Sequence, residues 1–326
     1  MGTRAIRWAL ALGLLLGAAA CDGGGGETTD ADASADPGPA EVAGSPDADA
    51  SSDPGPIGAC GPLGQPRMTV IQSLRFARES ESGAVWGIDI DGAVTAAGDP
   101  TGCGRADFTS PSGQPGVDNQ FATLAPILDE LGGSSLDEPV ETAIRTGELL
   151  LLVELQSVDD LVDDACLSVE IFRGAGQPSL GTNGLIVPGQ SFDIDLERPW
   201  SRTDEASITA GHLRAGPFPL QLPLTFFATS FTLDFDAAWL DADLDPETGE
   251  LSGVLAAQAS VEALLDAIED IDPNLASTAT LLLADAADLD PDAAGTCRSI
   301  SLAFEVRAVS AHLYPDTARP EAGTEL

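Results

Sequence analysis

The feature that most constrains the fold is an alternation of apolar and polar residues with a period of two, which recurs from about residue 61 to about residue 314. In the segment 300–306, Ile300, Leu302 and Phe304 fall on one side and Ser301, Ala303 and Glu305 on the other. Successive side chains of a strand point to opposite faces, so this pattern predicts a strand with one face in the core. Further strands are expected at 70–76, 84–90, 149–153, 169–171, 191–196, 208–213, 231–236 and 251–259.

Four stretches are expected to form helices instead. Phe121, Leu124 and Leu128 mark the first, which ends at Gly132 and Gly133. The second begins near Ser135, and the other two, around 261–268 and 274–287, are separated by Pro273. The sequence therefore predicts a mainly β fold, an antiparallel β-sandwich-like domain with a few inserted helices.

The N-terminus is typical of an exported protein. Arg4 and Arg7 precede an apolar run, Ala9–Ala20, which is too short to span a membrane and ends in small residues. Cys21 follows directly, as in a bacterial lipoprotein. We therefore expect residues 1–20 to be a signal peptide and Cys21 to be lipidated, which anchors the chain to a bacterial envelope membrane, inner or outer. The alternative is ordinary cleavage that leaves a free N-terminal cysteine.

The segment 21–60 is expected to be a disordered acidic tether. It is rich in Gly, Ala, Asp and Pro, and the ten residues at 30–39 recur at 47–56 with one change. Such a composition buries too little apolar surface to offset the entropy lost on folding. A β-rich globular domain is expected at 61–316 and a flexible C-terminal tail at 317–326.

The formal net charge is −39, and all fourteen basic residues are arginines. A field of this sign repels nucleic acid and attracts divalent cations or basic partners. Solubility in a salty exterior is the alternative, and it accounts for most of the acidic residues. The absence of lysine from the sequence excludes Schiff-base chemistry.

Four cysteines remain after Cys21: Cys60, Cys103, Cys166 and Cys297. Their spacing matches no zinc motif, and in an oxidising compartment they are expected to form two disulfides. Of the three possible connectivities, we expect Cys60–Cys103 and Cys166–Cys297.

The most distinctive stretch is the long loop 87–120, in which oxygen-bearing side chains lie among glycines and prolines. Ca²⁺ is bound by six to eight oxygens, mostly from carboxylates, amides and carbonyls. The loop is therefore a candidate calcium site, although it does not match an EF-hand. The alternative is that the same side chains cap turns and the helix at 121. The candidate ligands are Asp89, Asp91, Asp107, Asp118 and Asn119.

Motifs for catalysis are missing from the sequence, which has no GxSxG, HExxH or GxxxxGK[ST]. His212 and His312 both lie in strand patterns, which favours structural roles. We expect a binding or structural domain that contacts an extracellular or periplasmic ligand. A hydrolase of a polymer such as polysaccharide, which needs only two carboxylates, is the alternative.

The string CGRADFTSPSGQPGVDNQ at 103–120, with IDIDG before it, resembles a signature of uncharacterised lipoproteins from myxobacteria and their relatives. The later stretch DADLDPETGELSGVLAA is similar in the same way, so the resemblance covers about residues 68–312. It implies the envelope location and an important role for residues 87–120, but no activity.

Overall fold

The computed structural model describes residues 64–132, 135–226, 229–271 and 273–321. The expected signal peptide, Cys21 and the tether lie outside the described residues. Among the described residues, no helix is long and apolar enough to cross a membrane. The fold is mainly β with four helices, as the alternation predicts.

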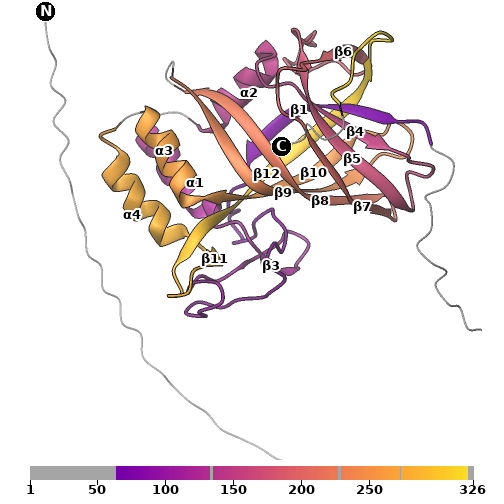
Figure 1. Ribbon diagram of the computed structural model, residues 1–326. Helices are drawn as coiled ribbons and strands as arrows, with labels where there is room; N and C mark the ends of the chain where they lie inside the picture. Colours follow the sequence, from indigo (N-terminus) through magenta and orange to yellow (C-terminus); the bar gives the residue numbers. More distant parts are fainter. Residues whose placement is uncertain (1–63, 133–134, 227–228, 272, 322–326) are drawn as a thin grey trace, which may run out of the picture. The chain divides into compact units, whose positions relative to one another are not determined.

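Eight antiparallel strands form the frame of the domain (Figure 1). Each of these strands is hydrogen-bonded to the next in the order β1 (Arg67–Phe76), β4 (Leu151–Gln156), β5 (Asp164–Ala175), β7 (Ser201–Thr209), β8 (His212–Phe226), β9 (Thr229–Leu244), β10 (Leu251–Ser260) and β12 (Cys297–Leu313). The last strand, β12, also pairs with the first, β1, over Met68–Phe76, so the strands close into a ring. The predicted β-sandwich-like fold is confirmed, with its two halves joined along both sides. Closure gives each of these strands a hydrogen-bonded neighbour on both sides over part of its length, while the far halves of β8 and β9 pair only with each other among the described residues.

Four short strands lie outside the ring. β6 (Gln190–Ile194) pairs with the end of β12 and with β5. β11 (Leu289–Pro291) pairs with the start of β12. β2 (Phe108–Thr109) and β3 (Pro115–Val117) form a separate two-stranded sheet. One core, built from the inward side chains of the ring strands, holds the domain together.

The helices lie where local patterns predict them. α4 (Ala276–Ala286) contacts both α1 (Phe121–Gly132) and α3 (Val261–Ile271), and all three helices contact β12 (Figure 1). α3 also packs against β9. α2 (Asp137–Thr146) packs against β1 and β8. It ends at Gly147, whose left-handed backbone (φ 83°) lets its N–H bond to Ile144 O.

Residues 77–120, here called the covering segment, lie over the outer face of β10 and β12. Ala77 and Ile88 pack there on Ala256 and Ala303 in a second, smaller apolar cluster. The covering segment therefore buries residues that alternation places on the solvent side, such as Ala303 and Ser301. The strand predicted at 84–90 is wrong, because only the isolated bridges Ala84–Thr109 and Ile88–Asp118 form there.

A second strand prediction also fails. The segment 208–213 is not one strand but the turn between β7 and β8, which reverses at Ala210 and Gly211. Both residues have positive φ, 52° and 79°. A period-two pattern continues across a two-residue turn, so the alternation cannot reveal the reversal.

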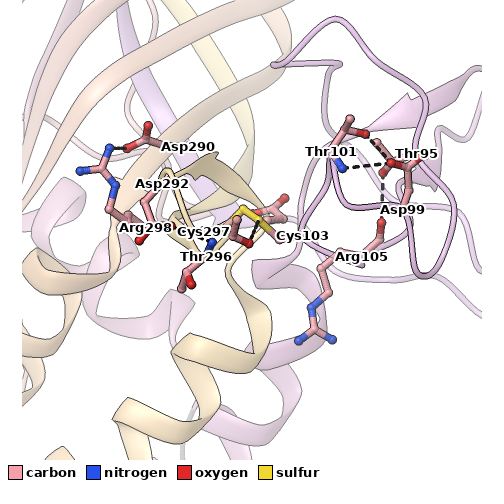
Figure 2. Close-up of a disulfide and its surroundings, with 12 residues drawn as sticks. Thr95, Asp99, Thr101, Cys103, Arg105, Asp290, Asp292, Thr296, Cys297 and Arg298 are labelled. Atoms are coloured by element: carbon pink, nitrogen blue, oxygen red, sulfur yellow. Dashed lines mark hydrogen bonds and ion pairs between the residues drawn. A yellow bond between two sulfur atoms is a disulfide. The ribbon is translucent and has the colours of Figure 1, made fainter.

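The predicted disulfide pairing is wrong. Cys103 is bonded to Cys297, so that the covering segment is tied to the first residue of β12 (Figure 2). Cys166 is also disulfide-bonded. Cys21 and Cys60 lie outside the described residues. Spacing along the chain carries no information on this pairing, because the covering segment reaches β12 only through the tertiary fold.

The first part of the predicted tail contacts the domain. The Thr317 hydroxyl donates to the Asp193 carboxylate (2.7 Å), and the Arg319 guanidinium pairs with Glu154. Residues 317–321 are thus held against the sheet, while 322–326 lie outside the described residues. The side-chain exposed fraction of Glu154 is only 3%, and a buried carboxylate requires a cation beside it.

Candidate metal site

Three of the five predicted ligands converge. Asp89 and Asp91 follow the residue Ile88, and Asp118 lies opposite Ile88 in an antiparallel bridge, where its N–H donates to Ile88 O (2.9 Å). One carboxylate oxygen from each of Asp89, Asp91 and Asp118 lies within 4.8 Å of the others. The bridge thus brings together side chains that are almost thirty residues apart.

Backbone N–H groups orient the three carboxylates. Asp118 accepts hydrogen bonds from Ile90 N (2.6 Å) and Asp91 N (3.3 Å). Asp89 accepts from Gly92 N (2.7 Å), and Asp91 accepts from Ala93 N (2.8 Å). Asp89 and Asp91 each use one oxygen, Oδ1, for these contacts, so the turn that follows Asp91 fixes both side chains.

Gly116 leaves room for the Asp89 carboxylate. Its φ of +84° is a conformation that L side chains rarely adopt. A Cβ at this position would lie 3.1 Å from Ala93 O and 3.5 Å from Asp89 Oδ2. A glycine is therefore required where β3 passes the cluster.

Asp118 is the buried member of the cluster, with an exposed fraction of 2%, whereas Asp89 and Asp91 are exposed. Burial raises the pKa of Asp118 to about 8, against the opposing effect of the hydrogen bond from Ile90 N. The negative charges of Asp91, Asp288 and Asp107 raise this pKa further. A cation beside the cluster would stabilise the ionised form of Asp118.

The donor set suits a hard cation. Ca²⁺ binds carboxylate oxygens at about 2.3–2.6 Å, so two of its ligands are separated by at most about twice that distance. The 4.8 Å limit within the cluster meets this requirement. Three oxygen donors favour Ca²⁺ or Mg²⁺ over metals that prefer imidazole or thiolate.

The other two predicted ligands have different contacts. Both oxygens of Asp107 bond to Thr95, to its N–H and to its hydroxyl (2.6 Å each). The Asn119 side chain is fully buried, and its Nδ2 donates to Trp86 O (2.9 Å). The side chains of Asp118 and Asn119 do not bond to the backbone of α1. Instead, the N–H groups of Ala122 and Thr123 reach the carbonyls of Asn119 and Gln120.

Ser301 anchors the cluster to the sheet. Its hydroxyl accepts a hydrogen bond from Gln120 N (2.8 Å) and donates to the buried Asp288 carboxylate. Burial raises the pKa of Asp288 to about 7, although the hydrogen bonds from Ser301 act in the opposite direction. The segment that follows Asp118 is therefore fixed to β12. In the sequence, Ser301 looks like an outward-facing strand residue, and no local pattern indicates this role.

A cluster of charged side chains around His212, on the outer face of the sheet, was not predicted from the sequence. His212 Nδ1 lies 2.8 Å from Asp243, and its Nε2 lies 2.8 Å from Asp241. Asp241 also pairs with Arg214 (2.9 Å). In the β8–β9 register, His212 lies opposite Asp243 and Arg214 opposite Asp241. In the sequence, basic residues occupy alternate positions of β8 and acidic residues occupy alternate positions of β9. This pattern indicates ion pairs only when the register of the two strands is known.

Two further buried carboxylates lie side by side on the strands β4 and β5. Glu154 of β4 and Glu170 of β5 face each other in register. Arg319 bonds to both oxygens of Glu154, and Arg202 bonds to Glu170 (2.7 Å). The pair is thus compensated by two guanidinium groups. Trp200 is buried and stacks on Phe172 with ring centroids 5.5 Å apart, which is a packing role.

None of the family models, curated proteins or solved structures compared with the chain matches it.

Proposed function

We propose that the protein is a cell-envelope lipoprotein that displays a β-rich binding domain, and that the covering segment of this domain holds a Ca²⁺ ion. The observation that carries the calcium site is the convergence of Asp89, Asp91 and Asp118, of which Asp118 is buried. Burial of a carboxylate among other carboxylates is unfavourable unless a cation compensates it. Asp89 and Asp91 are exposed, so an ion can reach the cluster from solvent.

In this proposal the ion stabilises the fold of the covering segment and takes no part in catalysis. It would join the turn at 89–93 to the end of β3, two parts of a segment that has little secondary structure of its own. Binding to the folded state alone stabilises that state in proportion to the logarithm of ion concentration over Kd. The covering segment is thereby fixed on the sheet, and its surface is pre-formed for a ligand.

The test for calcium is calorimetric titration into the full chain, purified in mild detergent and stripped with a chelator. We expect saturable binding and a higher melting temperature with Ca²⁺. Asp118→Asn and Asp89→Asn should abolish the binding, while Asp107→Asn, whose contacts are to Thr95, serves as the matched control. Absence of binding at millimolar Ca²⁺ contradicts the calcium site.

The proposed location in the cell envelope depends on the N-terminal residues from Arg4 to Cys21. The chain is expressed in a bacterial host, and the intact mass is measured in membrane and soluble fractions. The mass should correspond to cleavage before residue 21 plus acyl chains, and Cys21→Ala should release the protein from the membrane. A mass that fits cleavage without added lipid contradicts the anchor.

A carboxylate-based hydrolase is the second candidate. The observation that favours it is the pair Glu154 and Glu170, directly opposite on adjacent strands, of which Glu154 lines a cleft of about 280 Å³. The ion pairs with Arg319 and Arg202 favour a structural role for both groups. Release of reducing ends from a polysaccharide by the wild type, lost in Glu154→Gln and Glu170→Gln, would support the hydrolase.

A further inference from the structure

A cleft of about 370 Å³ lies where the covering segment meets the sheet. Ile88 and Asp89 of the covering segment line one part of it, and residues of β7, β8 and β9 line the rest. We call it the seam cleft. Its volume lies in the range of small-molecule sites, about 300–1,000 Å³. The sheet residues that matter below are Glu205, Arg214, Gly216, Trp239 and Asp241.

An indole forms part of the cleft surface. Trp239 is half-buried and packs against the apolar cluster beneath the covering segment. Gly216 lies beside it, and a Cβ on Gly216 would come within 2.8 Å of the indole Cδ1. The glycine therefore leaves the indole uncovered at a bulge, where the register of β8 shifts against β9. An aromatic ring in this position offers an apolar surface with a defined orientation.

Asp241 and Arg214 of the cleft hold each other in place before any ligand arrives. Asp241 bonds to His212 (2.8 Å) and pairs with Arg214 Nε (2.9 Å). This contact uses one of the five donors of the guanidinium, and the Arg214 side chain is 66% exposed. Glu205 is exposed and adds an acceptor. The cleft thus contains hydrogen-bond donors and acceptors around one aromatic surface, and the Asp241–Arg214 ion pair orients one of each.

This mixture limits the ligand class. An apolar ligand would leave the carboxylates and the guanidinium desolvated without partners. A phosphate-like anion is repelled by Asp89, Glu205 and Asp241, which outnumber the cation Arg214. A neutral molecule with many hydroxyl groups and an apolar C–H face satisfies all the groups, because hydroxyls both donate and accept.

We infer that the seam cleft binds a saccharide unit of an extracellular glycan. The C–H face of the sugar lies on Trp239, and its hydroxyls donate to Glu205 and Asp241 and accept from Arg214. This inference rests on the binding function proposed above and names its ligand class. Asp89 belongs to both the carboxylate cluster and the cleft, so an ion on the cluster would lie at the wall of the sugar site.

The test is calorimetric titration of the full chain with the neutral sugars cellohexaose, mannohexaose, chitohexaose and xylohexaose, each with Ca²⁺ and with a chelator. We expect saturable binding of at least one hexasaccharide. Glu205→Gln should raise its Kd about tenfold, the cost of weakening hydrogen bonds to a charged group. Trp239→Ala should abolish binding, and Glu247→Gln, in the exposed turn after β9, is the matched control.

Glu205 is exposed, so its variant should fold even where Trp239→Ala does not. Binding of none of the four hexasaccharides overturns the sugar site, as does binding that Glu205→Gln and Trp239→Ala both leave unchanged. Spermine provides the contrasting probe, since tighter binding of this cation than of any sugar would make the cleft an acidic patch and overturn the inference. Calcium binding without sugar binding leaves the metal proposal standing, and sugar binding without calcium binding leaves only the sugar site.

Discussion

Cys103 and Cys297 are 194 residues apart in the chain and are joined by a disulfide, which fastens the covering segment to the first residue of β12. The carboxylate cluster lies in the same segment. Its position on the sheet therefore depends on the disulfide and on the hydrogen bonds that Ser301 makes with Gln120 and Asp288, in addition to the apolar packing of the covering segment on β10 and β12.

Replacing both cysteines, Cys103→Ser with Cys297→Ser, should lower the free energy of unfolding by about 2–5 kcal/mol. The disulfide closes a long loop and so limits the conformational freedom of the unfolded chain. The Ca²⁺ affinity should also fall, because the covering segment is then less ordered before binding. Urea denaturation and calorimetry measure the two effects. An unchanged unfolding midpoint would contradict the structural role of the bond.

Gly116→Ala should destabilise the protein and weaken Ca²⁺ binding. The added Cβ would lie 3.1 Å from Ala93 O and close to Asp89, at a φ of +84°. Gly113→Ala is a matched control, because Gly113 has φ +87° and nothing within 4 Å of the added Cβ. Both changes carry the backbone cost, about 1–2 kcal/mol. If the two variants have the same stability and the same Ca²⁺ affinity, Gly116 makes no special contribution.

Asp288 should make stability fall as the pH rises. Its pKa in the folded state is about 7, above the ordinary value of 3.8, because burial disfavours the ionised form. The folded state therefore holds the proton more tightly, and this contribution is complete below pH 3.8 and lost as the pH passes 7. The loss is on the order of 4 kcal/mol. Thermal melts from pH 4 to 8 should show a shallower decline in Asp288→Asn, and equal slopes would refute the assignment.

His212 should stabilise the protein at mildly acidic pH. Burial lowers its pKa, but the hydrogen bonds and charges of Asp243 and Asp241 outweigh this effect and raise it above 6.5. A raised histidine pKa contributes stability that is complete below pH 6.5 and is lost as the pH rises through the folded-state value. The melting temperature of His212→Gln should therefore lie below that of the wild type at pH 6 and match it at pH 9. A constant difference across this range would count against the ion pairs.

Arg319→Ala should destabilise the domain by about 1–3 kcal/mol. The change leaves Glu154 without its bidentate partner, and a buried carboxylate without a cation is costly. The side chain of Arg319 is 42% exposed, so solvent screening keeps the effect below that of a fully buried pair. Arg307→Ala is the control, since Arg307 is exposed and has no ion pair among the described residues. Equal melting temperatures for the two variants would show that residues 317–321 contribute no stability.

Local patterns in the sequence predict most of the fold. Local patterns located all four helices, and alternation located the strands around Phe304 and Phe235. The strand around Leu152 was located by the continuous apolar run 149–153. Alternation failed at 84–90, where the chain is extended but forms only isolated bridges. It also failed at 208–213, where the reversal at Ala210–Gly211 leaves the alternation intact.

The candidate site could be predicted in part. Asp89, Asp91 and Asp118 stand out in the sequence as oxygen donors near turns, and the fold brings them together. Asp107 and Asn119 have the same residue types but bond to Thr95 and Trp86. Composition identifies possible ligands, but the direction of each side chain depends on the Ile88–Asp118 bridge. The seam cleft left no trace in the sequence, because its walls come from segments more than a hundred residues apart.

The sequence by itself determined the period of each element, the acidity and the set of possible donors, because these depend on residue type and on neighbours along the chain. Tertiary structure decided the closure of β12 on β1, the Cys103–Cys297 bond and the burial of Asp118 and Ser301. These depend on which surfaces meet when the chain folds. A carboxylate becomes a candidate ligand, or a serine an anchor, only when a distant segment removes water from around it.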